Sequence, residues 1–244
     1  MRIPVIEGLI DRRILANYRV DAGVLARLLP SPFRPKLIHG YGVAGICLIR
    51  LKRLRPKVLP LPVGIGSENA AHRIAVEWDS NGRRAEGVYI PRRDTNSRLN
   101  TLGGGRIFPG EHHHARFRVT EVGDDYSVAL DSDDGRTHVS ISGRVSDRLP
   151  ATSVFTSLDE ASAFFEHGSL GYSATSDSSR LDGLELRCKR WQVAPLDVTR
   201  IESSFFDDVT KFPPGSAMFD CALLMRGIEH EWHSRDDICC AAGI

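Results

Sequence analysis

"HRIAVEWDSNGRRAEGVYIPRR" occupies residues 72–93 and decides the fold class of this chain. Alternating apolar and polar residues flank Asn81-Gly82, the dipeptide that most strongly favours a tight β-hairpin turn. The stretch therefore predicts two antiparallel strands joined by a two-residue turn. The second strand runs into Pro91 and then into two consecutive arginines, Arg92 and Arg93.

Strand signals continue on both sides of this hairpin. "YGVAGICLIRL", residues 41–51, is an apolar run of the length of a buried strand, and Asp134-Gly135 joins two further alternating segments. Residues 184–193 and 217–232 supply two more. No linker-like segment or internal repeat divides the chain. We therefore expect one α+β domain over residues 1–244, built on a barrel or a strongly curved sheet.

Short helices are predicted between the strands. Asp21 can cap a helix that begins at residue 22 and stops before Pro30. Ser157 and Glu160 have the spacing of a capping box, and Gly168 lies where that second helix would end.

Charge and composition exclude several classes of protein. The formal net charge is +1, with 41% hydrophobic and 26% charged residues, as in ordinary folded proteins. The basic segment 50–57 lacks interleaved aromatic residues and any nucleic-acid reader motif. No stretch approaches the roughly 18 uninterrupted apolar residues of a membrane helix, and the first residues lack a signal-peptide core. We expect a cytoplasmic protein that binds neither nucleic acid nor membrane.

Cysteine and lysine counts limit the chemistry. Five irregularly spaced cysteines, an odd number, argue against a disulfide framework and for reduced thiols. Only five of the 32 basic residues are lysines, at positions 36, 52, 57, 189 and 211. Arginine keeps its proton and cannot act as an amine nucleophile, so amine chemistry has five candidates.

The histidine run "EHHHARF", residues 111–117, raises the question of a metal. His112 and His114 alternate on a predicted strand and would project to the same face. A third ligand would have to come from Glu68, His72 or His138, and no ligand set with metal-site spacing is present. We expect no metal and no cofactor.

Three stretches occur in a characteristic order: "NYRVDAGVLARLLPSPFRP" at 17–35, "GIGSENAAHRIAVEW" at 64–78, and "YIPRR" at 89–93 with the insertion "DTNSRLNTLGGGRIFP" after it. Together they resemble the acetoacetate decarboxylase superfamily, and more closely its uncharacterised YqjF-like branch. The resemblance covers most of the chain. It implies an α+β fold that is mainly an antiparallel, cone-shaped β-barrel with a few flanking helices and an interior pocket.

The resemblance also implies where the chemistry lies. The decarboxylases carry a Pro-Lys-Lys pair where this chain has Pro91, Arg92 and Arg93, and one lysine of that pair forms a Schiff base with a keto acid. A guanidinium cannot form that imine, so the decarboxylase mechanism is expected to be absent. Two positive charges at the same position favour an anion instead. Successive strand residues point to opposite faces, so the sequence leaves open which arginine faces the pocket.

Two functions follow as hypotheses. The first is a small-molecule pocket protein acting on a small carboxylate or oxo acid by acid/base chemistry without a Schiff-base lysine. Glu68, near an acidic pocket residue of the decarboxylases, and His114 are its candidate catalytic groups. Arg92, Arg93, Asn96 and His112 are the candidate ligand-binding residues. The alternative is a non-catalytic metabolite-binding or scaffold protein. The expected partner is a small anionic molecule, and whether the chain forms a homo-oligomer stays open.

Overall fold

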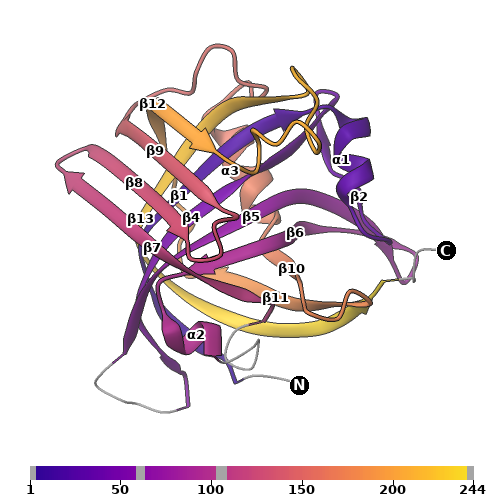
Figure 1. Cartoon of the computed structure of the whole chain (residues 1–244), viewed down its shortest axis with the longest axis horizontal. Helices are drawn as coiled ribbons and strands as arrows, with labels where there is room; N and C mark the ends of the chain where they lie inside the picture. Colours follow the sequence, from indigo (N-terminus) through magenta and orange to yellow (C-terminus); the bar gives the residue numbers. More distant parts are fainter. Residues whose placement is uncertain (1–3, 59–63, 103–108, 241–244) are drawn as a thin grey trace.

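Strands make up most of the described residues, and the three helices among these residues are short and lie outside the sheet (Figure 1). The computed structural model describes residues 4–58, 64–102 and 109–240. The helices are α1 (Ala22–Leu28), α2 (Arg98–Leu102) and α3 (Leu158–His167). The strands are β1 (Ile6–Val20), β2 (Arg34–Pro35), β3 (Leu37–Ile38), β4 (Tyr41–Pro56), β5 (Ile65–Ser80), β6 (Arg83–Thr95), β7 (His112–Val122), β8 (Asp125–Ser132), β9 (His138–Val145), β10 (Leu170–Ala174), β11 (Arg180–Cys188), β12 (Ala194–Ser203) and β13 (Ala217–Cys239).

All of these strands belong to one sheet, which closes on itself twice. The long strands β13, β1, β4, β5 and β6 form a shared wall. One ring is completed by β11 and β10, and the other by β12, β9, β8 and β7. Most pairs are antiparallel, whereas β6 pairs in parallel with both β7 and β10. The expectation of a mainly antiparallel α+β fold is confirmed.

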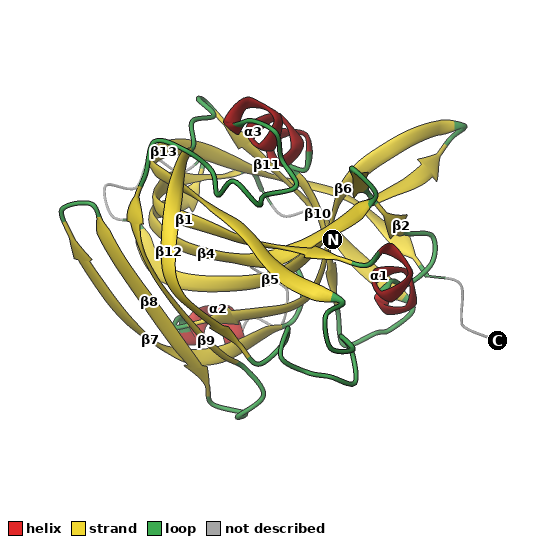
Figure 2. Cartoon of the chain, turned by 90° about the horizontal axis from the view of Figure 1, so that it is seen from above, coloured by secondary structure: helices red, strands yellow, loops and turns green. Residues whose placement is uncertain are grey.

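Each face of the shared wall has its own hydrophobic core, because successive strand residues point to opposite sides. Ile14, Ile46 and Leu48 pack on the face covered by β8, β9 and β12. Leu15 and Cys47, on the opposite face, belong to the cluster that includes α3. In Figure 2 the strands β7–β9 and the helix α3 lie on opposite sides of β1, β4 and β5.

Both predicted helix starts are confirmed. The side chain of Asp21 accepts hydrogen bonds from the backbone N–H groups of Gly23 (2.8 Å) and Val24 (3.2 Å) at the start of α1. Ser157 Oγ accepts one from the N–H of Glu160 at 3.1 Å, and Gly168 follows the last residue of α3. These bonds satisfy backbone donors that have no partner within the helix.

The predicted hairpin is also confirmed, and it contains an irregularity that matters for the site. Asn81 (φ 50°) and Gly82 (φ 74°) adopt the left-handed conformation of a tight hairpin turn. The register then shifts between two pairs, Ile74 with Tyr89 and His72 with Arg92. Between these two pairs the chain advances three residues along β6 but only two along β5. β6 therefore carries one extra residue, a β-bulge.

All five cysteines are unpaired thiols in the structure. Among the described residues, no helix is long and apolar enough to cross a membrane.

Candidate functional site

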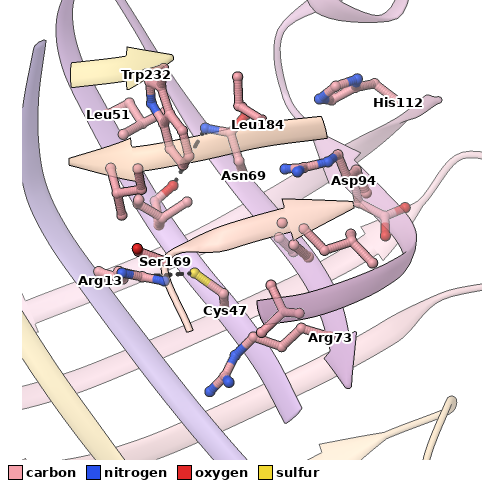
Figure 3. Close-up of a pocket in the computed structure, with 18 of the residues that line it drawn as sticks. Arg13, Cys47, Leu51, Asn69, Arg73, Asp94, His112, Ser169, Leu184 and Trp232 are labelled. Carbon is pink, nitrogen blue, oxygen red and sulfur yellow. Dashed lines mark hydrogen bonds between the residues drawn. The ribbon is translucent and has the colours of Figure 1, made fainter. Parts of the chain in front are cut away.

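A cavity of about 90 Å³ lies within the ring that β10 and β11 complete (Figure 3). By a comparable measure one water needs about 10–15 Å³, so the space suits a ligand of a few non-hydrogen atoms. Every strand of the ring contributes to its lining. The lining residues include Arg13, Cys47, Ile49, Asn69, Ala71, Arg73, Ile90, Arg93, Asn100, His112, Ser169, Leu184 and Trp232.

Three arginines line this cavity. Arg93 donates from Nε to Ser173 Oγ at 2.9 Å, and Arg13 donates from Nε to Cys47 Sγ at 3.2 Å. Arg73 is only 5% exposed, donates to the side-chain oxygen of Asn17 and stacks on Phe165. Burial lowers the pKa of both Arg73 and Arg93 to about 10, which leaves both protonated at neutral pH. The cavity is therefore strongly cationic.

None of these three guanidinium groups forms an ion pair with a carboxylate of the described chain. Arg73 Nε has no hydrogen-bond partner at all there. Asp94 touches the cavity, but its carboxylate binds Arg92. A buried cation without an anion costs several kcal/mol, so these three charges are energetically unfavourable as they stand.

The bulge decides which arginine of the pair faces the cavity. Ala71 pairs with Arg93, and the two point to the cavity side of the wall. Arg92 pairs with His72 and points to the other side, where it binds Asp94 and Asp134.

His112 lies at the Arg93 end of the cavity, since these two residues pair between β7 and β6. Its Nδ1 lies 3.2 Å from the carbonyl oxygen of Gly110 and can donate a hydrogen bond to it. Burial, with the positive charge of Arg93 adding to it, lowers the pKa of His112 to about 3. The imidazole is therefore neutral at physiological pH, and its other nitrogen, Nε2, is then an acceptor.

Glu68 and Asn96 lie together but outside the cavity. The carboxylate of Glu68 accepts hydrogen bonds from Arg12 at 2.6 Å and from Arg50, on the face of the wall opposite to the cavity. Asn96 Oδ1 accepts from the backbone N–H of Glu68 at 3.0 Å. Because Arg12 is fully buried, this carboxylate compensates a charge inside the protein.

His114 also lies outside the cavity, where its Nδ1 is 2.7 Å from a carboxylate oxygen of Asp133. His112 and His114 thus have different neighbours despite their alternation. Within the described ranges, no group of three or more His, Cys, Asp or Glu side chains is placed to hold a metal ion.

No lysine lines the cavity among the residues that the structure describes. Each of the five lysines instead forms an ion pair with a carboxylate, in the pairs Lys36–Glu86, Lys52–Asp11, Lys57–Glu231, Lys189–Glu229 and Lys211–Asp208. The amine of a Schiff-base mechanism is therefore missing from this part of the molecule.

Sequence reasoning missed Arg13, Arg73 and Cys47. The sequence provides only a weak indication that Arg73 faces a pocket. Asn69, Ala71 and Arg73 alternate along one strand, and the residues of its other face become apolar from Ile74 onward. For Arg13 and Cys47 there is no such indication, since their approach depends on the pairing of β1 with β4.

The fold is similar to that of acetoacetate decarboxylase-like proteins of known structure. The acetoacetate decarboxylase of Legionella pneumophila superposes with a TM-score of 0.61 at 11% identity, over 95% of this chain and 87% of that one. An acetoacetate decarboxylase-like enzyme from Sphingomonas wittichii RW1 has the same TM-score and identity, over 98% and 94%. The enduracididine biosynthesis enzyme MppR complexed with pyruvate gives 0.57 at 13% identity, over 99% and 91%.

The chain belongs to the DUF2071 family, described as uncharacterized conserved proteins, which matches residues 10–222. No curated protein sequence matches the chain. The resemblance to the decarboxylase superfamily and to an uncharacterised branch of it is therefore confirmed, and it establishes the fold.

Proposed function

We propose that this protein binds a small carboxylate or oxo acid in the cavity and acts on it by acid/base chemistry without a Schiff-base lysine. One observation carries the proposal: Arg13, Arg73 and Arg93 line one small cavity without a carboxylate partner among the described residues. The complex of MppR, a protein of similar fold, with pyruvate agrees with a ligand of this class.

The physical reason is charge compensation in a desolvated site. A guanidinium can bind a carboxylate through two parallel, charge-assisted hydrogen bonds. Such bonds are stronger in a partly buried cavity than in water, because the local dielectric constant is lower. Burial lowers the pKa of Arg73 and Arg93 because it disfavours their charged forms. A bound anion would offset this free-energy cost.

We assign proton transfer to His112, because it lines the cavity whereas Glu68 and His114 lie outside it. A bound anion would offset the charge of Arg93 and raise the pKa of His112 from about 3 toward the working range of a base. The base would remove a proton from the carbon beside the oxo group. The guanidinium groups would stabilise the enolate oxygen that develops.

Calorimetry with pyruvate and 2-oxobutyrate tests the binding step. Wild-type protein is expected to bind both, and Arg93→Gln to bind at least about ten-fold more weakly, the effect of about 1.4 kcal/mol. Arg92→Gln is the matched control, because Arg92 points to the other side of β6. Equal affinity in wild type and Arg93→Gln would count against the site.

Exchange of the ligand's methyl or methylene protons in D₂O, followed by NMR, tests the chemical step. Catalysed exchange that His112→Gln abolishes without loss of binding is the expected result. Binding without exchange would instead favour the alternative function, a non-catalytic metabolite-binding protein.

A further inference from the structure

We infer that the natural ligand is a dianion, a short dicarboxylate or oxo dicarboxylate with one acidic group at each end of the cavity. This inference rests on the proposed function and narrows its substrate class. The evidence is the number of cavity arginines without a carboxylate partner, their distribution over the ring, and the mainly apolar character of the rest of the lining.

The cationic groups belong to two parts of the cavity. Arg93 and His112 lie together where β6 pairs with β7. Arg13 comes from β1 and reaches Cys47 on β4. In Figure 3 Arg13 and His112 lie on opposite sides of the cavity, with Asn69 between them. A ligand with one charged group can bind closely at one of these ends only.

The protein itself provides little negative charge to compensate the arginines at either end of the cavity. Arg13 contacts the sulfur atoms of Cys47 (3.2 Å) and Met225 (3.8 Å) and the ring of Trp191. Asp182 is the carboxylate that favours the charge of Arg93, but it accepts hydrogen bonds from the Gly110 N–H and from Arg180.

Arg73 adds a third charge close to the Arg13 end. Its pKa is lowered mainly by burial and partly by Arg13, so these two cations act on each other. Asn17, its hydrogen-bond partner, is a neutral amide. Three cations against one carboxylate would leave two uncompensated charges, whereas a dianion leaves one.

Apart from Asn69, the uncharged part of the lining is mainly apolar. Ile49, Ala71, Ile90 and Leu184 contribute side chains to it, from four different strands. A short hydrocarbon segment is the chemical group that such side chains accommodate. The small cavity volume limits this segment to a few carbon atoms.

Calorimetry at constant ionic strength with succinate, monomethyl succinate and butyrate tests the inference without any variant. We expect succinate to bind at least about ten-fold more tightly than the two monoanions, as for a second close charge pair. Equal affinity of all three would overturn the dianion while leaving the carboxylate site intact. Absence of binding by any acid, pyruvate included, would overturn the proposed function as well.

The variant Arg13→Gln locates the second charge. It should reduce the preference for succinate over butyrate to about one while butyrate still binds, whereas Arg92→Gln should keep the preference. Inorganic phosphate, whose charges are on one centre, should compete poorly. Competition by phosphate as strong as that by succinate would overturn the two-ended arrangement in favour of one compact anion subsite.

Discussion

Replacing Arg93 by lysine should introduce an amine that can form an imine in the cavity. Burial lowers the pKa of Arg93 by more than two units, to about 10. The same environment would lower the pKa of a lysine from about 10.4 to roughly 8. About half of the introduced amines would then be neutral at pH 8, and a neutral amine attacks a keto carbonyl. The expected product with pyruvate is an imine that borohydride reduces to a stable adduct.

Arg92→Lys is the matched control for this experiment. Burial disfavours the charge of Arg92, but hydrogen bonds to Asp94 and Asp134 outweigh it and raise the pKa. A lysine there would stay protonated and would lie on the other side of β6. Mass spectrometry of the intact protein after borohydride treatment measures the adduct. An adduct in Arg92→Lys equal to that in Arg93→Lys, or none in Arg93→Lys at pH 8 to 9, would refute the placement of Arg93.

Three further predictions concern stability and access. His72→Leu should make the folded protein less sensitive to acid. Burial, together with the charges of Arg92 and Lys211, lowers the pKa of His72 from 6.5 to about 3. As the pH falls below 6.5, the unfolded state therefore binds a proton that the folded state does not, and the wild type loses stability. Between pH 7.5 and 4.5 wild type should lose about 3 kcal/mol more than the variant in urea unfolding, and an equal loss would contradict this. Glu68→Gln should cost about 2 kcal/mol of stability, because it removes a charged hydrogen bond to buried Arg12, which keeps its second carboxylate partner Glu121. Carboxylate affinity should not change, and weakened binding at unchanged stability would return Glu68 to the site. Ala71→Leu should fill the cavity and abolish pyruvate binding in calorimetry, and retained affinity would place the ligand elsewhere.

Local sequence signals predicted the local structure well. Asn81-Gly82, Asp21 and Ser157 act within a few residues of themselves, and their turn and caps form as predicted. The two closed rings could not be derived in this way, because they depend on β6 and β13 each pairing with two strands along one edge. The resemblance to a known superfamily supplied the expectation of a cone-shaped barrel with an interior pocket, and the second ring was not predicted.

The sequence predicted positive charge at the candidate site, but only some of the residues that line the cavity. Of the six predicted residues, the structure brings Arg93 and His112 to the cavity. Arg92, Glu68, Asn96 and His114 bind other partners. Residues far apart in sequence, Arg13 and Arg73, complete the cationic lining, and only the pairing of their strands brings them close to Arg93.

The sequence alone determined that two arginines follow Pro91, that few lysines are available, and that the hairpin turns at Asn81-Gly82. It therefore determined that an imine cannot form at this position and that a positive charge stays there. The tertiary structure decided which arginine faces the cavity. In a regular strand Val88 and Ile90 would share a face with Arg92, but the extra residue in β6 reverses the alternation and turns Arg93 inward. A bulge is stabilised by the neighbouring strands, so its position is set by the whole sheet rather than by the residues beside it.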